Sequence, residues 1–276
     1  MDSTIKVSLC QMKVIDDKDI NIEKAIKMIE TSAKNNADVV ILPEMFNCPY
    51  DNSKFRAYAE NLVNGKTIES ISKAAREFKV HIIAGSIPEL AEEKLYNTCF
   101  AIDDNGNTIG RHRKVHLFDV NIPGKIEFRE SDMLAPGNDI TVVDIGCCKI
   151  GIAICYDVRF PELFRLMALK GAQMIVIPAA FNMTTGPLHW ELLMRARAVD
   201  NQVFIAAVSP ARNENANYVA YGNSMVVDPF AEVLVRLGGE EDILYSNIDL
   251  SKLTKVRNEL PLLKHRREDI YEVYEK

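Results

Sequence analysis

The chain has 276 residues, a formal net charge of −6 at pH 7 and 26% charged residues. This length is enough for one large domain or two small ones. An acidic total argues against a nucleic-acid partner, which would require clustered positive charge. No apolar run approaches the ~18 residues of a membrane helix, and no signal-peptide pattern opens the sequence. We therefore expect a cytoplasmic protein with no membrane partner.

Strand and helix patterns alternate along the first half of the chain. Apolar runs predict strands at residues 5–12, 38–45, 81–89, 95–103 and 108–118. Apolar residues at helical spacing predict helices at residues 19–35 and 67–79. The Asp-Asn-Gly-Asn segment at residues 104–107 is a hairpin turn signal. A loop punctuated by proline and glycine is expected from Asp119 to Gly137.

The second half of the chain continues the same alternation. Strands are predicted at residues 139–145, 147–155, 172–181, 203–211, 222–229, 232–237 and 243–250. Helices are predicted at residues 161–170 and 186–199, and the charged segment 251–276 is expected to be a mostly helical tail.

No repeat and no Ser/Gly/Pro-rich linker divides this pattern. We therefore predict a single α/β domain over residues 1–276. Hairpins and strand–helix–strand units occur side by side, which predicts mixed sheets. Several strands are apolar on both faces, so two mixed sheets covered by helices are expected.

The six cysteines give no sign of a metal site. They lie at positions 10, 48, 99, 147, 148 and 155. No C-x-x-C pair occurs and no cysteine pair faces a histidine pair, so no metal or other cofactor is predicted. Free thiols are the default in a reducing cytosol. Most are expected to be small buried hydrophobes, and nothing assigns Cys147 and Cys148 a role beyond packing.

Three apolar strands each carry a different reactive group at or near their C-terminal end: Glu44, Lys114 and Cys155. Ligands and catalytic groups collect at such strand ends. A cysteine nucleophile needs a base or a lowered pKa, so Glu44 can take the thiol proton. Lys114 can stabilise the oxyanion that forms when the thiolate attacks an amide or nitrile carbon. Taken singly, each residue suits a structural role, and only the combination favours catalysis.

Other catalytic arrangements fit less well. A cysteine–histidine pair would use His112, His116 or His189, but no spacing selects one of them. Residues 222–224 lack the second glycine of a nucleophile elbow. Neither a Walker loop nor a G-x-G-x-x-G motif occurs.

The segments LPEMFNCPY (42–50), RHRKVHLFD (111–119) and ICYDVRFPEL (154–163) carry a family resemblance. Over nearly its whole length the chain resembles the carbon–nitrogen hydrolase (nitrilase) superfamily. The resemblance implies a four-layer αββα sandwich, a Glu-Lys-Cys triad at the positions named above, and no cofactor. It also implies pairing into homodimers or larger homo-oligomers through helices next to the active site.

Further segments are similar to the omega-amidase branch: PGKIEFRES and LAPG within residues 123–137, AFNMTTGPLHW (180–190) and RARAVDNQVFIAAVSPARN (195–213). That branch hydrolyses the terminal amide of 2-oxoglutaramate and 2-oxosuccinamate. The resemblance implies that Glu130 is a second acid near the lysine. It also implies an oxyanion hole formed by Lys114 and the backbone N–H of Tyr156.

The same resemblance implies a substrate pocket with a cationic anchor. Arg159 matches the branch's carboxylate-binding arginine, and a guanidinium can hold a carboxylate in a bidentate manner. A structural ion pair of Arg159 with Asp157 or Glu162 is the competing interpretation. The remaining pocket positions are Tyr50, Phe181 and Thr185, and the first two also suit the core. The chain departs from common family residues at Asn223 and Ala231.

The leading hypothesis is an amidohydrolase that takes a small carboxylate-bearing amide, most specifically an omega-amidase. The alternatives within the superfamily are a deaminated glutathione amidase, an N-carbamoyl amino acid hydrolase and a nitrilase. A non-catalytic scaffold is the alternative outside it. The intact triad argues against a scaffold, because burying a lysine and a glutamate is costly without a function that needs them.

Overall fold

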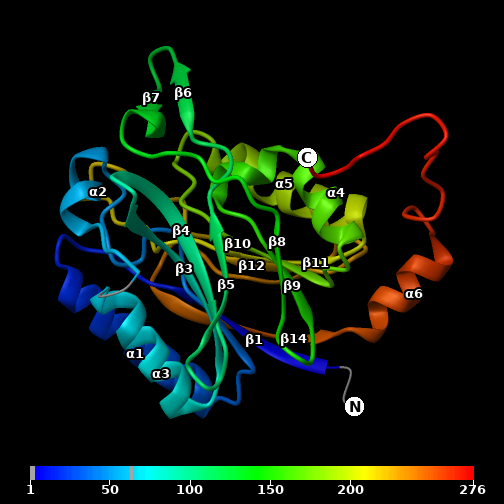
Figure 1. Ribbon diagram of the computed structural model, residues 1–276, viewed down its shortest axis with the longest axis horizontal. Coiled ribbons are helices and arrows are strands. Elements are labelled where there is room, and N and C mark those ends of the chain that lie inside the picture. Colours follow the sequence, from blue (N-terminus) through cyan, green and yellow to red (C-terminus); the bar gives the residue numbers. More distant parts are fainter. Residues whose placement is uncertain (1–3, 63–64) are drawn as a thin grey trace.

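Two six-stranded sheets form the centre of the computed structural model, which describes residues 4–62 and 65–276 (Figure 1). The first sheet has the order β14-β1-β2-β3-β4-β5. Its strands are β1 (Thr4–Gln11), β2 (Val39–Ile41), β3 (His81–Ala91), β4 (Lys94–Ile102), β5 (Thr108–Arg113) and β14 (Asp242–Asp249). The second sheet has the order β13-β12-β11-β10-β9-β8. Its strands are β8 (Thr141–Asp144), β9 (Lys149–Ile152), β10 (Met174–Pro178), β11 (Phe204–Val208), β12 (Met225–Val227) and β13 (Val233–Arg236).

Helices cover the outer face of each sheet. The helices are α1 (Lys18–Lys34), α2 (Asn52–Tyr58), α3 (Lys66–Phe78), α4 (Pro161–Leu169), α5 (Gly186–Asn201) and α6 (Ser251–Glu259). Helices α1 and α3 lie over the first sheet, and α4 and α5 lie over the second (Figure 1). One apolar cluster joins the inner faces, with Val7 and Leu9 from the first sheet and Ile150 and Ile152 from the second. The predicted αββα sandwich of two mixed sheets is confirmed.

The parallel strands decide where the site lies. Strands β1, β2 and β3 are parallel neighbours in the first sheet, and β9, β10 and β11 are parallel neighbours in the second. Parallel strands deliver their carboxyl ends to one edge of a sheet. The chain after β2 and β9 therefore emerges at such edges, and these are the segments that carry Glu44 and Cys155.

The three strands that precede the triad residues are shorter than predicted. Strand β2 ends at Ile41, β5 ends at Arg113 and β9 ends at Ile152, so Glu44, Lys114 and Cys155 all lie beyond them. Pro43 has no backbone N–H to donate to a neighbouring strand, so β2 does not continue through it. The backbone of Cys155 has φ +47°, a left-handed conformation that no strand accommodates.

The predicted elements differ from the structure in three further places. Short helix α2 was not predicted, and the expected loop from Asp119 to Gly137 contains the hairpin β6 (Asp119–Ile122) and β7 (Ile126–Arg129). This hairpin projects from the body of the molecule (Figure 1). The helical tail is wrong beyond Glu259, because Pro261 cannot continue the helix and residues 260–276 form turns and extended chain. Among the described residues, no helix is long and apolar enough to cross a membrane.

Candidate active site

Hydrogen bonds to both carboxylate oxygens fix the orientation of the Glu44 side chain. Its Oε1 accepts hydrogen bonds from Asn97 Nδ2 at 2.9 Å and from Lys114 Nζ at 3.0 Å. Its Oε2 accepts one from the backbone N–H of Ala180 at 2.7 Å. Burial raises the pKa of Glu44, and the nearby Lys114 charge opposes that shift. A carboxylate with a raised pKa is suited to exchanging protons near neutral pH.

A glycine makes room for the loop that carries Glu44. A Cβ atom on Gly85 would lie 2.0 Å from the backbone oxygen of Leu42 and 2.2 Å from that of Pro43. Strand β3 also shifts register between Ala84 and Ile87. The Leu42–Pro43 backbone can therefore pack directly on β3 only because residue 85 has no side chain.

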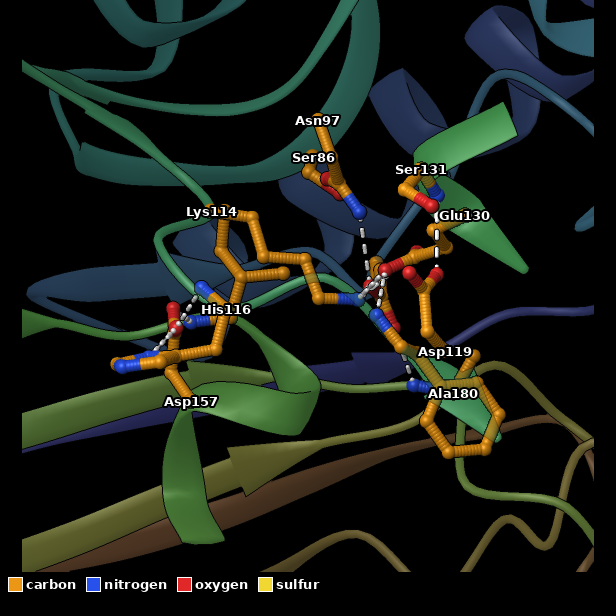
Figure 2. A network of polar contacts seen from close by, with 12 residues as sticks. Ser86, Asn97, Lys114, His116, Asp119, Glu130, Ser131, Asp157 and Ala180 are labelled. Atoms are coloured by element: carbon orange, nitrogen blue, oxygen red, sulfur yellow. Dashed lines mark hydrogen bonds and ion pairs between the residues drawn. The ribbon is translucent and has the colours of Figure 1, made fainter. Parts of the chain in front are cut away.

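Lys114 is buried between two carboxylates. Its Nζ lies 2.9 Å from Oε1 and 2.8 Å from Oε2 of Glu130, and 3.0 Å from Glu44 Oε1 (Figure 2). Burial alone would lower the pKa of Lys114, but the two carboxylates raise it well above its usual value. The group is therefore an ammonium at neutral pH, as an oxyanion-stabilising role requires.

Glu130 begins a short 3-10 segment, Glu130–Asp132, directly after β7. Besides Lys114, its carboxylate accepts hydrogen bonds from Phe118 N at 2.6 Å and from Tyr50 Oη at 2.6 Å. The structure thus places this second acid on the lysine, as the family resemblance implied. Tyr50 lies here, against Glu130 and 3.4 Å from Lys114 Nζ, and does not line the pocket beside Cys155.

Cys155 is buried at the start of a second 3-10 segment, Cys155–Arg159. Burial raises the pKa of its thiol well above the usual value, the Glu44 charge and a hydrogen bond to Glu44 raise it further, and Lys114 opposes the shift. The resting group is therefore a neutral thiol beside a carboxylate. Such a thiol becomes nucleophilic when the neighbouring base takes its proton.

Asp157 ties the Cys155 turn to the segment that follows Lys114. Its Oδ1 accepts hydrogen bonds from His116 N at 2.9 Å and His116 Nδ1 at 2.8 Å. Its Oδ2 accepts one from Ile154 N at 3.0 Å and lies 3.3 Å from His112 Nε2. Sequence reasoning missed this clamp, of which Figure 2 shows the contacts between His116 and Asp157. It treated both histidines only as candidate partners of a cysteine, whereas the structure places them on Asp157.

A small pocket of about 190 Å³ opens beside the thiol. Its lining residues are Phe118, Cys155, Tyr156, Arg159, Ala180, Phe181, Thr185 and Tyr218. Four pocket positions implied by the resemblance therefore meet around Cys155: Tyr156, Arg159, Phe181 and Thr185. No motif in the sequence pointed to Phe118, Ala180 or Tyr218 as pocket residues.

Arg159 enters this pocket without a carboxylate partner in the described part of the chain. Its guanidinium lies 5.1 Å from the centre of the Phe181 ring and 5.6 Å from that of Tyr156. Its Nη1 donates to Nδ1 of His189 at 3.3 Å. The competing ion pair with Asp157 or Glu162 is not formed, so the charge remains available to an anionic group.

The two departures from common family residues lie outside the pocket lining. Asn223 and Ala231 both have left-handed backbones, with φ of +66° and +68°. Asn223 bonds to Arg236 and to the backbone of Tyr221. Among the described residues, no group of three or more His, Cys, Asp or Glu side chains is arranged to hold a metal ion.

Comparison with known proteins places this chain in a family. The family model for carbon-nitrogen hydrolases matches residues 6–258. The omega-amidase NIT2 of Mus musculus is 48% identical over 99% of both chains, and that of Homo sapiens is 45% identical over 98% of both. The crystal structure of Saccharomyces cerevisiae Nit3, a member of branch 10 of the nitrilase superfamily, is 42% identical. It matches with a TM-score of 0.89 and covers 96% of this chain and 97% of that one. The chain therefore belongs to the carbon-nitrogen hydrolase family.

Proposed function

We propose that this protein is an omega-amidase, which hydrolyses the terminal amide of a short dicarboxylic acid monoamide such as 2-oxoglutaramate or 2-oxosuccinamate. The observation that carries the proposal is the Arg159 guanidinium, which has no carboxylate partner among the described residues and lies in the same small pocket as Cys155. The similarity to omega-amidases over nearly the whole chain supports the same substrate class. In this proposal residues 1–276 act as one catalytic domain in the cytoplasm.

The first half of the reaction acylates the cysteine. Glu44 takes the proton of the Cys155 thiol, and the sulfur attacks the amide carbon. The oxyanion that forms accepts hydrogen bonds from Lys114 Nζ and from the backbone N–H of Tyr156. That N–H lies in the first turn of a 3-10 segment, where backbone donors have no partner within their own turn. Losing one such donor typically costs ~100- to 1,000-fold in rate.

The second half releases ammonia and restores the thiol. Glu44 returns its proton to the amide nitrogen as the carbon–nitrogen bond breaks, so ammonia leaves and a thioester remains. Glu44 then takes a proton from a water molecule, whose oxygen attacks the thioester carbon. The second oxyanion collapses, the carbon–sulfur bond breaks and the thiolate takes the proton that Glu44 received from water. Glu130 keeps Lys114 charged throughout because it neutralises part of that buried charge.

Substrate choice follows from the pocket walls. The free carboxylate of the substrate pairs with Arg159, and the Phe181 ring and the Thr185 side chain bound the chain between carboxylate and amide. A planar guanidinium suits a carboxylate better than a point charge does. The Phe118, Phe181 and Tyr218 side chains line the pocket around Cys155, and such a narrow lining favours a short acid over a peptide-sized amide.

Ammonia release from purified protein tests this proposal. The panel is 2-oxoglutaramate, a neutral amide of equal length, deaminated glutathione, N-carbamoyl amino acids and simple nitriles. We expect fast release from the oxo-acid amide alone. Cys155→Ala should abolish release, and Arg159→Leu should lower kcat/KM far more for the oxo-acid amide than for the neutral amide. Equal losses on both amides would remove the anchor role, and release by Cys155→Ala would contradict the nucleophile.

We also propose that copies of the chain pair through helix α5. Leu188 and Leu192 lie one turn apart on this helix and are 69% and 64% exposed, and Phe230 is 64% exposed. Exposed apolar residues gathered beside an active site are typical of an interface. Leu188→Glu combined with Leu192→Glu should convert a dimer to a monomer in light scattering. An unchanged mass would contradict this pairing.

A further inference from the structure

We infer that Tyr218 is a positioning residue for Glu44, acting through the backbone of Ala180. The inference rests on the proposed role of Glu44 as the general base. Two hydrogen bonds join the three residues. Tyr218 Oη donates to the carbonyl oxygen of Ala180 at 2.6 Å, and Ala180 N donates to Glu44 Oε2 at 2.7 Å. The Tyr218 hydroxyl thus fixes Ala180, and the N–H of Ala180 fixes the carboxylate of Glu44.

Ala180 needs such an anchor because it lies beyond its strand. Strand β10 ends at Pro178, and Ala179 N makes the last bond across to Val208 at 2.8 Å. The next backbone tie of the segment runs from Tyr221 N to the carbonyl of Phe181. Between these two ties, the Ala180 carbonyl bonds to the Tyr218 hydroxyl.

The space around Glu44 makes its orientation sensitive to this anchor. A second cavity reaches Glu44 and Ala180 next to the Cys155 pocket. Tyr218 and Ala180 line both cavities, so they form part of the wall between them. If the Ala180 N–H moved away, the carboxylate would have open space into which to turn. Its other oxygen, bonded to Asn97 and Lys114, would still allow that rotation.

The ring of Tyr218 is fixed independently of its hydroxyl. It packs against the ring of Tyr50 with centroids 4.6 Å apart and against Phe128 at 5.8 Å. Removing only the hydroxyl therefore leaves the aromatic packing in place. Tyr218→Phe separates the proposed positioning role from a role in filling the core.

The reactivity of Cys155 with iodoacetamide tests the inference without reference to the natural substrate. In this reaction the sulfur displaces iodide from carbon while Glu44 receives the thiol proton. We expect Tyr218→Phe to slow alkylation of Cys155 about tenfold, measured by mass spectrometry of the peptide that contains it. Alkylation of the exposed Cys147 in the same sample should not change. The matched control is Tyr58→Phe, which loses a 2.6 Å hydroxyl bond to Asp16 outside the Cys155 pocket.

The pH profile of the same alkylation is a second measurement. It would stay unchanged if Tyr218 served only to stabilise the fold. The charged or titratable groups around Glu44 are Lys114, Glu130, Cys155, Tyr50 and Tyr218. The substitution removes only the Tyr218 hydroxyl, whose pKa burial raises well above its usual value, so no charge is lost. The Ala180 N–H lowers the pKa of Glu44, so loosening it should move the acidic limb of the profile to higher pH.

Three results distinguish the possibilities. Slower Cys155 alkylation, a shifted acidic limb and an unchanged melting temperature support the inference. Alkylation at the wild-type rate overturns it. A large fall in melting temperature with faster alkylation of Cys155 also overturns it, because the hydroxyl would then serve only to hold the fold. If no panel amide releases ammonia, the proposed substrate fails while this test of Tyr218 stands.

Discussion

Asp157→Asn should damage both the stability and the activity of this protein. The Asp157 carboxylate is buried and takes four close contacts, from Ile154 N, His116 N, His116 Nδ1 and His112 Nε2. An asparagine keeps one oxygen, which can serve one pair of these donors. Its amide nitrogen is itself a hydrogen-bond donor, so it would face the other two donors without forming a hydrogen bond to them.

The magnitude follows from the bonds that are lost. Hydrogen bonds to a charged group contribute about 1.5–3 kcal/mol each. Losing two of the four therefore costs about 4 kcal/mol of unfolding free energy. For a domain of this size each kcal/mol lowers the melting temperature by about 2–4 °C. We expect a fall of about 8–16 °C in Asp157→Asn relative to the wild type.

The pH dependence of this loss has a definite sign. Burial raises the pKa of Asp157, but hydrogen bonds from His112 and His116 lower it by more, so it lies far below its usual value. A carboxyl with a depressed folded-state pKa contributes stability above its unfolded pKa of about 3.9. That stability is lost as the pH falls through the folded-state pKa. The difference between wild type and variant should be full above about pH 5 and shrink below about pH 4.

Thermal unfolding followed by circular dichroism at several pH values measures this effect. Turnover of the best panel amide measures the consequence for Cys155, whose left-handed backbone lies in the turn that the Asp157–Ile154 bond spans. We expect kcat to fall about tenfold or more, since misplacing a reacting group by about 1 Å can cost 100-fold. A melting temperature within 2 °C of the wild type at pH 7 would refute the reasoning about the clamp.

Two further substitutions test the remaining supports of the site. Glu130→Gln removes one of the two carboxylate charges beside Lys114. It also leaves Phe118 N or Tyr50 Oη without an acceptor, so kcat should fall ~100-fold. A loss of less than threefold in the ammonia assay would contradict this expectation. Gly85→Ala would place a Cβ 2.0 Å from backbone and should cost about 3 kcal/mol in urea unfolding. Gly238→Ala, where a Cβ meets nothing within 4 Å, is its control, and equal stabilities of the two variants would contradict the packing argument.

The apolar runs in the sequence predicted two mixed sheets covered by helices, because such patterns are local. The αββα layering and the pocket residues beyond the triad were implied by the family resemblance. Each triad residue lies within three residues of the end of a strand. The Asp157 clamp was not predictable in this way. It joins residues 112 and 116 to residue 157, and nothing in either segment shows that the two meet.

Errors in the predicted elements also have local physical causes. The hairpin β6–β7 has two strands of four residues each, too short for an apolar alternation to stand out. The tail beyond Glu259 carries charges at helical spacing, but Pro261 ends the helix. The strand before Cys155 looked continuous because Ile152, Ala153 and Ile154 are all apolar. A positive φ at Cys155 leaves no trace in hydrophobicity.

The charges of the site explain why the thiol stays neutral until it is needed. Glu44, Glu130 and Lys114 carry a net charge of about −1 when all three are ionised, and all are buried. A thiolate would add a second negative charge, which is why burial and Glu44 raise the pKa of Cys155 while Lys114 opposes them. Proton transfer to Glu44 keeps that total constant. In the proposed mechanism, the negative charge then moves from Glu44 through sulfur to the substrate oxygen, where Lys114 Nζ can stabilise it. In this mechanism, Lys114 therefore stabilises a negative charge that the site already holds, on an oxygen that becomes negative only as the transition state forms.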